Sequence, residues 1–323
     1  MNGRRLLASI IIIVTLSLSK GAPQPALAAT SSPPLLVATR FVLVYVDGDT
    51  RQTASAGANT GNYRLLRTLA DGSVLVSFND GGSLDVESIS PSLGSRRIKS
   101  FPRGTAFIGP STDGFVAYDG MTQLLRRYDE RGSVVGNPIA PSGVRDALGI
   151  DDATVVLGSG RLAVWDRGGR LRHEIILDAG AMVMMPDNRF AVTDVQYGEV
   201  RTYTAALDLV GRLRLPQRSP RAIAAGPDGS IAVLTGTPSC VSNDAEVDVY
   251  DSATSDQPRA RIRRDVGTAN AVAIDANGVY VANNGCRGDG DGSVAVFARD
   301  GTPRGVITNV GSPTGVLPFN PPK

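Results

Sequence analysis

Short runs of apolar residues alternate with polar turns along most of the chain, and residues 181–215 show this pattern most plainly. There an apolar run is followed by the turn Pro186-Asp187-Asn188 and by strand-like runs at 189–193, 199–203 and 207–215. β-Branched and aromatic residues fill the runs, and Pro, Asp, Asn and Gly fill the gaps, which is typical of antiparallel strands joined by tight turns. The segment therefore predicts one four-stranded antiparallel unit.

The same unit recurs on both sides of this segment. Six turns, each before a short apolar strand, carry an Asp or Asn at the corresponding position: Asp71, Asp113, Asp152, Asp187, Asp228 and Asn277. Their spacings of 42, 39, 35, 41 and 49 residues fit a β-propeller blade, which repeats about every 40 residues. Blades packed around an axis bury the apolar strands that a single sheet leaves exposed. We therefore predict an all-β protein, a β-propeller of four-stranded antiparallel blades, with six blades and with seven as the alternative.

The two ends of the repeat region lack complete blades. Residues 35–46 are strongly strand-like, and the Gly-, Ala-, Thr-, Ser- and Asn-rich segment 48–62 indicates a long surface loop. Residues 311–316 resemble the opening of a blade that has no second strand after it. We expect residues 62–323 to form the propeller and segment 35–46 to join its last strand and close the ring. The ends either add an edge to six blades or build part of a seventh.

Residues 1–28 have the composition of a signal peptide. Arg4 and Arg5 precede an apolar run at 6–18, and Ala26-Leu27-Ala28 is a small-residue cleavage motif. The apolar run is shorter than the roughly 20 residues of a membrane-spanning helix. We therefore expect cleavage after Ala28 and export, to the periplasm or the medium, with no membrane span in the mature chain, which would start with a strand and loop region at 29–61.

The charge of the mature chain argues against two classes of partner. The whole chain has a net charge of +2, and removal of Arg4, Arg5 and Lys20 leaves 30 basic residues against 31 acidic ones. Such a balance favours neither nucleic acid nor an anionic membrane as the partner. We expect a monomer that recognises a protein or a small molecule.

Two segments of the chain resemble a known family. The segments PRAIAAGPDGSIAV at 220–233 and NAVAIDANGVYVAN at 270–283 resemble NHL-type repeats and related propellers, including the gluconolactonase-like ones. The resemblance extends over roughly residues 62–318 and rests on turn and strand residues, so it implies an architecture rather than an activity.

The resemblance implies that the working face surrounds the central channel. In an ordinary propeller, the loop entering each blade and the loop after its second strand share one rim. Polar residues on these loops, among them Asn79, Asp80, Asp119 and Gln196, could bind a polar or anionic small molecule, although such residues are also usual in turns. The candidate rim residues are Arg103, Arg145, Asp146, Asp194, Arg221, Asn270, Asn283 and Asn284.

A metal-dependent hydrolase is the alternative to a binding or scaffold module. Gluconolactonase-like propellers imply a divalent cation on Glu, Asn and Asp side chains at this rim, where it polarises a carbonyl and activates water. Asp194 and Asn283 are of the right type, but the first blade offers no acidic ligand. The one histidine, His173, argues against a lyase with a histidine pair or a three-histidine zinc site. A purely structural envelope protein is the third possibility, and whether the chain is an enzyme stays open.

Two further residue pairs carry predictions. Cys240 and Cys286 follow the second strands of adjacent repeats, and equivalent loops of adjacent blades lie close together, so we predict a disulfide in the oxidising compartment of an exported protein. Asp289 and Asp291 resemble the start of a calcium-binding loop. The third carboxylate and the distal Glu of that pattern are missing, which leaves a weak calcium site or a plain acidic loop.

Overall fold

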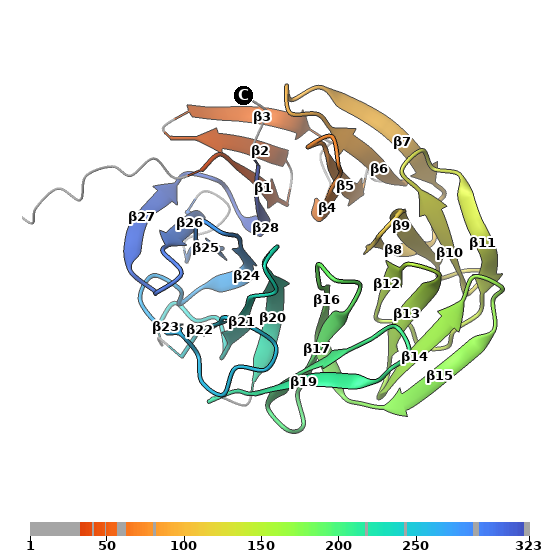
Figure 1. The fold of residues 1–323 in the computed structure, drawn as a ribbon. Helices are drawn as coiled ribbons and strands as arrows, with labels where there is room; N and C mark the ends of the chain where they lie inside the picture. The colour runs from red at the N-terminus through yellow and green to blue at the C-terminus, as the bar shows by residue number, and fades with distance from the viewer. Residues whose placement is uncertain are drawn as a thin grey trace, which may run out of the picture. The chain divides into compact units, whose positions relative to one another are not determined.

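The computed structural model describes residues 33–40, 42–48, 50–56, 63–79, 82–216, 219–241, 244–286 and 291–319, and the proposed signal peptide lies outside them. The described residues form 28 strands and no helix (Figure 1). Among them we find no helical segment long and apolar enough to span a bilayer.

The described strands form six hydrogen-bonded sheets, five of which have four strands. One of the five joins both ends of the chain in the order β28 (Pro313–Pro318), β1 (Leu35–Thr39), β2 (Val42–Asp47) and β3 (Thr50–Ala56). The other four follow the chain, as β4 (Arg64–Thr68), β5 (Val74–Asn79), β6 (Leu84–Ile89) and β7 (Ser95–Phe101); β16 (Ala179–Met184), β17 (Phe190–Asp194), β18 (Glu199–Tyr203) and β19 (Leu209–Arg214); β20 (Pro220–Ala225), β21 (Ile231–Thr235), β22 (Glu246–Tyr250) and β23 (Ala260–Ile262); and β24 (Ala269–Ile274), β25 (Val279–Asn283), β26 (Ser293–Phe297) and β27 (Pro303–Thr308).

The remaining sheet has eight strands, in the order β11 (Val134–Ile139), β10 (Leu124–Asp129), β9 (Gly114–Asp119), β8 (Thr105–Ser111), β12 (Asp146–Ile150), β13 (Ala153–Gly158), β14 (Arg161–Asp166) and β15 (Leu171–Ile176). It consists of two antiparallel meanders, which meet where Gly149 pairs in parallel with Ser111. A Cβ atom on Gly149 would clash with the Ser111 side chain, and one on Gly109 would clash with the carbonyl of Ala147. Glycine therefore permits the close approach of β8 and β12.

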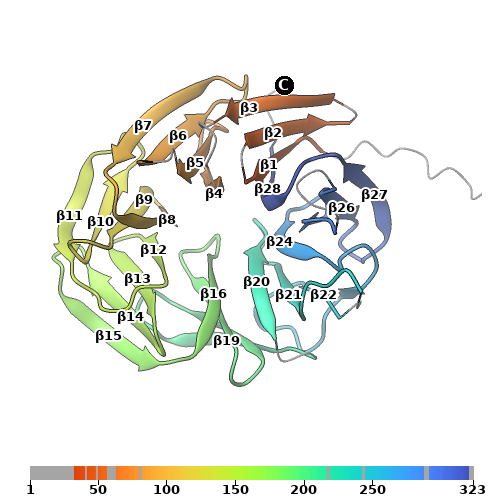
Figure 2. The same ribbon diagram turned by 180° about the vertical axis from the view of Figure 1, so that it is seen from behind.

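The described strands thus group into four-stranded antiparallel meanders, which we call blades. Six of them, from β4 to β27, correspond to the six repeats recognised in the sequence, with each repeat turn between the first and second strands. The ends of the chain form a further sheet instead of adding an edge to one of the six, and Val37 of β1 pairs with Val316 of β28. The first strands contact one another in the cyclic order β4, β8, β12, β16, β20, β24, β28 and back to β4. Figure 2 shows this arrangement from behind.

The predicted loop at 48–62 is wrong over residues 50–56, where β3 forms. Thr50 pairs with Asp47 and Thr53 with Val44 of β2. Because β3 is the outermost strand of its sheet, it carries few apolar residues, and the apolar signal of a strand is weak there. The predicted single strand at 35–46 is divided into β1 and β2.

The core lies between neighbouring blades, and β1 shows how it is built. All five residues of β1 are buried. Leu35 and Val37 pack with the sheet of β24–β27, and Leu36 and Ala38 pack with the sheet of β4–β7. Because successive side chains point to opposite faces, a strand covered on both faces is apolar throughout.

A buried arginine links the two halves of the eight-stranded sheet. Arg127 on β10 is 4% exposed. Its Nε donates to Asp113 Oδ1 at 2.7 Å and its Nη1 donates to the carbonyl of Ala153 at 2.9 Å. The guanidinium therefore joins the β8–β9 turn of its own blade to the β12–β13 turn of the next.

We predict that Arg127→Met lowers the free energy of unfolding by about 3 kcal/mol, since the Asp113 carboxylate and the Ala153 carbonyl lose their charged donor. Urea denaturation of the purified protein measures this loss. Arg126→Met, on the same strand but only partly buried, serves as the control and should change stability by less than about 0.5 kcal/mol. Equal effects of the two substitutions would contradict the assigned role of Arg127.

Candidate functional site: the axial channel and its rim

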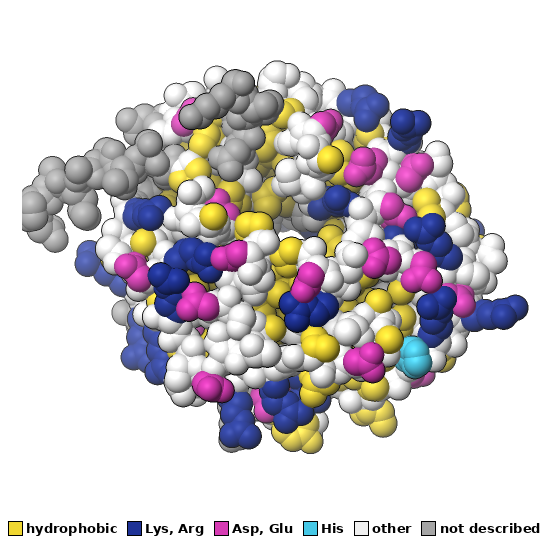
Figure 3. Space-filling model, viewed as in Figure 1, with side chains coloured by type: hydrophobic (Ala, Val, Ile, Leu, Met, Phe, Trp, Pro, Cys, Tyr) yellow, Lys and Arg dark blue, Asp and Glu magenta, His cyan; other side chains and the backbone are white. Residues whose placement is uncertain are grey.

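The first strands of the blades surround a cavity on the axis. It has a volume of about 300 Å³, and its lining side chains come from β4, β8, β12, β16, β20, β24 and β28. With the exception of Arg64 these side chains are apolar, and they include Leu65, Leu148, Ile223 and Val316. In Figure 3 hydrophobic side chains border a hollow in the middle of the face, and most charged side chains lie farther out.

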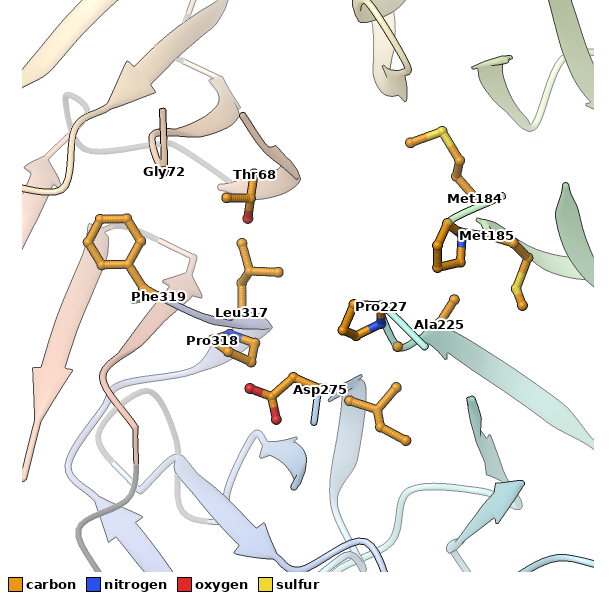
Figure 4. A pocket seen from close by; sticks show the side chains of 13 residues that line it. Thr68, Gly72, Met184, Met185, Ala225, Pro227, Asp275, Leu317, Pro318 and Phe319 are labelled. Atoms are coloured by element: carbon orange, nitrogen blue, oxygen red, sulfur yellow. The ribbon is translucent and has the colours of Figure 1, made fainter. Parts of the chain in front are cut away.

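A second cavity of about 410 Å³ continues the first toward the turns that follow the inner strands. Met184, Ala225, Ile274, Leu317 and Pro318 line both cavities. Figure 4 shows methionine side chains on one side of this pocket and Leu317, Pro318 and Phe319 on the other. The two cavities therefore adjoin and form an axial channel, lined mostly by apolar side chains, that reaches the turn face opposite the predicted rim.

The lone acid in the wider cavity is engaged within its own turn. The Asp275 carboxylate accepts hydrogen bonds from the backbone N–H groups of Asn277 and Gly278 and from the Tyr280 hydroxyl. The burial of the Tyr280 side chain, and secondly the negative charge of Asp275, raise the pKa of Tyr280 above its usual range. Asp275 therefore holds the β24–β25 turn.

Three arginines lie at or next to the rim ends of inner strands, and one of them, Arg64, also lines the axial cavity. Arg64 Nη2 lies 3.1 Å from Asp146 Oδ1, so an ion pair spans from β4 to β12 past the intervening β8. Arg145 Nη1 donates to the carbonyl of Ala179 at 3.1 Å, where β16 begins. Arg221 Nη1 donates to the carbonyl of Ala269 at 3.2 Å, where β24 begins. Each guanidinium thus contacts the first residue of an inner strand that belongs to a different blade.

These arginines differ in how their charge is balanced. Asp146 partly neutralises Arg64, whereas in the described part of the chain Arg145 and Arg221 form no ion pair with a carboxylate. All three side chains are exposed to solvent. Burial of part of the Arg221 side chain lowers its pKa, because desolvation disfavours the charged form. Of these three arginines, only Arg64 therefore has its charge balanced by a described carboxylate.

Arg64 was missing from the sequence-predicted set, although a sequence signal for it exists. Arg64, Arg145 and Arg221 each stand seven residues before the aspartate of their repeat turn, at Asp71, Asp152 and Asp228. This shared repeat position places all three at the start of an inner strand. Asn270 occupies the same position before Asn277 and lies partly buried on β24.

None of the predicted rim residues, Arg145, Asp146 and Arg221 included, is among the residues that line the axial cavities. Asp194 Oδ2 lies 2.8 Å from Arg201 Nη2, and its side chain is 1% exposed. Asn283 is buried and its Nδ2 donates to the carbonyl of Asp265 at 2.9 Å, while the Asn284 backbone N–H donates to the carbonyl of Thr268. Arg103 lines a separate cavity of about 190 Å³ beside Asn79. The contacts of Asp194, Asn283 and Asn284 stabilise the ends of their own strands and loops. Asp194 and Asn283 also belong to different blades, with the β20–β23 blade between them.

The metal predictions remain untested by the structure. Asp80 and Asp289 lie outside the described residues, and Asp291 forms a bridge to Gly311. Within the described ranges, no group of three or more His, Cys, Asp or Glu side chains is arranged to hold a metal ion. His173 is exposed on the outer strand β15.

Comparison with known proteins identifies the fold. No family model matches the chain, and no curated protein matches its sequence. A structure of the dihydro-heme d1 dehydrogenase NirN has a TM-score of 0.58 and 12% identity, over 89% of this chain and 75% of that one. The streptogramin B lyase structure has a TM-score of 0.54 and 14% identity, over 87% of this chain and 91% of that one. Kluyveromyces lactis Hsv2p has a TM-score of 0.54 and 13% identity, over 84% and 92%. The chain is a β-propeller. At such identities the likeness concerns the fold alone.

The predicted disulfide links two loops of the rim. Cys240 and Cys286 are bonded, with their Cα atoms 5.6 Å apart, and the bond joins the loops that follow β21 and β25. The prediction of this disulfide is confirmed. It is compatible with an exported protein.

Beneath the rim, β22 buries two carboxylates. The Asp248 side chain is fully buried, its two oxygens lack hydrogen-bond partners among the described residues, and Arg261 Nε lies 3.6 Å from Oδ1. Glu246, two residues earlier on the strand, pairs with Arg263. Burial, and secondly the nearby Glu246 carboxylate, raise the pKa of Asp248 to about 7.

We predict that replacing both cysteines with serine lowers the free energy of unfolding by about 4 kcal/mol, because the disulfide restricts a 46-residue separation in the unfolded chain. Guanidinium denaturation of the wild type with and without a reductant, beside the double variant, measures the effect. Reductant should leave the double variant unchanged. A wild type that keeps its unfolding midpoint after reduction would contradict this expectation.

Stability should also depend on the ionisation of Asp248. Between the unfolded-state pKa of about 4 and the folded-state pKa of about 7, the folded protein binds the extra proton. Stability attributable to this group therefore falls as pH rises through that window. We expect Asp248→Asn to lose less stability than the wild type between pH 5 and pH 8 in urea denaturation. Asp251→Asn, at an exposed position, is the control, and parallel pH profiles for Asp248→Asn and wild type would disprove the assignment.

Proposed function

We propose that this protein is an exported binding module that holds a small anionic molecule at the rim mouth of its axial channel. The observation that carries the proposal is the state of Arg145 and Arg221. Both are exposed where an inner strand begins, and their described partners are backbone carbonyls at the starts of two other inner strands. A guanidinium in that state keeps free donors and its full charge for a carboxylate or phosphate.

The rest of the fold supports a stable ring for this site. The cyclic contacts of the inner strands and the sheet shared by β1 and β28 support a closed propeller of seven blades. The signal-like residues 1–28 and the disulfide support export. Because propellers of similar fold include enzymes and proteins of WD40 repeats, the proposal rests on the residues of the site.

A protein partner on the same rim is the second candidate. The loops that follow β9, β17 and β21 expose Met121, Tyr197 and Val241, and exposed apolar side chains on one face favour a protein contact. The hydrolase has less support, since the Asp194 carboxylate is paired with Arg201 and neither Asp194 nor Asn283 lines the axial cavity.

We expect isothermal titration calorimetry to detect binding of citrate and inorganic phosphate to the mature protein. Arg145→Met and Arg221→Met should each weaken that binding about tenfold or more, because each removes a charged hydrogen-bond donor. Asp146→Asn should tighten it, since Arg64 then loses its competing carboxylate. Arg259→Met, which breaks an exposed ion pair with Asp251 on the outer part of a blade, should have no effect. Absence of binding, or equal binding by the two rim variants and the wild type, would refute the proposal.

A further inference from the structure

Apart from Arg64, the side chains that line the inner axial cavity are apolar. Its wall consists of Leu65 and Leu66 from β4, Met182 and Met184 from β16, and similar side chains from the other inner strands. The charged side chain that lines the inner cavity, Arg64, lies at its rim end. A small hydrophilic anion would leave this apolar wall in contact with water.

The channel is long enough for a chain. An inner strand such as β28 has six residues, which corresponds to about 17 Å from first to last Cα. The two axial cavities share residues from four strands and continue to the turn face, where Pro186, Pro227 and Phe319 line the wider end (Figure 4). A linear group that enters beside the arginines can therefore extend through the molecule.

Resting on the proposed anion site, we propose that the ligand is an anionic amphiphile, with its carboxylate or phosphate head on Arg145 and Arg221 and its alkyl or acyl chain along the axial channel among Leu65, Ile223 and Met184. Charge complementarity fixes the orientation, because the wider end of the channel offers the ligand the engaged Asp275 carboxylate and no described cation. Methionine side chains adapt to chains of different shape, and three of them, Met182, Met184 and Met185, line the two cavities.

A chain-length series tests this assignment. Calorimetry would compare acetate, hexanoate, octanoate, decanoate and dodecanoate, each below the concentration at which it forms micelles. Each methylene that enters the channel should lower the Kd by about fourfold, until the chain reaches the wider end and the gain stops. Dodecyl phosphate and dodecanol complete the series. The phosphate distinguishes a phospholipid-like head from a fatty-acid head, and the neutral alcohol should bind at least tenfold more weakly than either anion.

Variants separate the channel from the rim. Ala225 lines both cavities, so Ala225→Phe should block the chain and remove the dependence on chain length while leaving phosphate and citrate binding intact. Ala225→Leu is a milder variant with the same expected direction, and thermal unfolding establishes that each variant is folded. Arg259→Met is again the control and should reproduce the wild-type series.

The possible outcomes distinguish this inference from the anion site on which it rests. Binding of phosphate and citrate with a Kd for alkanoates that does not change with chain length would overturn the amphiphile and leave the anion site in place. No binding of any anion would overturn both. Dodecanol as tight as dodecanoate, or a chain-length dependence that survives Ala225→Phe and Ala225→Leu, would also overturn the assignment.

Discussion

Every sheet of this protein needs a neighbour on each face, and the pairing of β1 with β28 satisfies that requirement where the two ends of the chain meet. Leu35 and Val37 cover one neighbouring sheet while Leu36 and Ala38 cover the other. Without this sheet, the apolar faces of the β4–β7 and β24–β27 blades would meet water. Because the innermost strand of this sheet is C-terminal to the repeats and the other three are N-terminal to them, the neighbouring repeats depend on a pairing of residues nearly 280 positions apart in sequence.

The features that sequence predicted well are those fixed by local chemistry. Turn residues such as Asp228 accept hydrogen bonds from the next residues of their own turn, so they mark each repeat without tertiary information. The strand β3 was missed because an outermost strand needs few apolar residues. The pairing of β8 with β12 depends on the close contact of Gly149 with Ser111 of the preceding blade. No local sequence pattern indicates that contact. Arg64 was detectable only by comparing positions between repeats, since one arginine before one strand carries no signal.

The polar rim residues illustrate why residue type does not decide a role. Asp194 ends β17 and Arg145 directly precedes β12. Asp194 is buried against Arg201 on the adjacent strand, whereas Arg145 reaches a carbonyl of the next blade and stays exposed. Separating a buried ion pair is costly, so such a pair fixes a loop. An exposed guanidinium bound to a neutral carbonyl loses little when an anion approaches. The interaction partner of each charged side chain therefore distinguishes a structural residue from a candidate binding residue, and only the structure identifies that partner.

The apolar character of the channel is not explained by folding alone. Side chains that pack neighbouring blades together, such as Val37 and Phe190, are fully buried. Leu65, Met184 and Ile223 instead are only partly buried while they line the axial space. Apart from β8 and β12, which pair with each other, each inner strand is also the edge of its sheet, so polar side chains on the axis could meet solvent without leaving a core. Apolar residues at such positions keep hydrocarbon in contact with water unless another apolar group fills the channel, and that cost is recovered when a ligand chain does so.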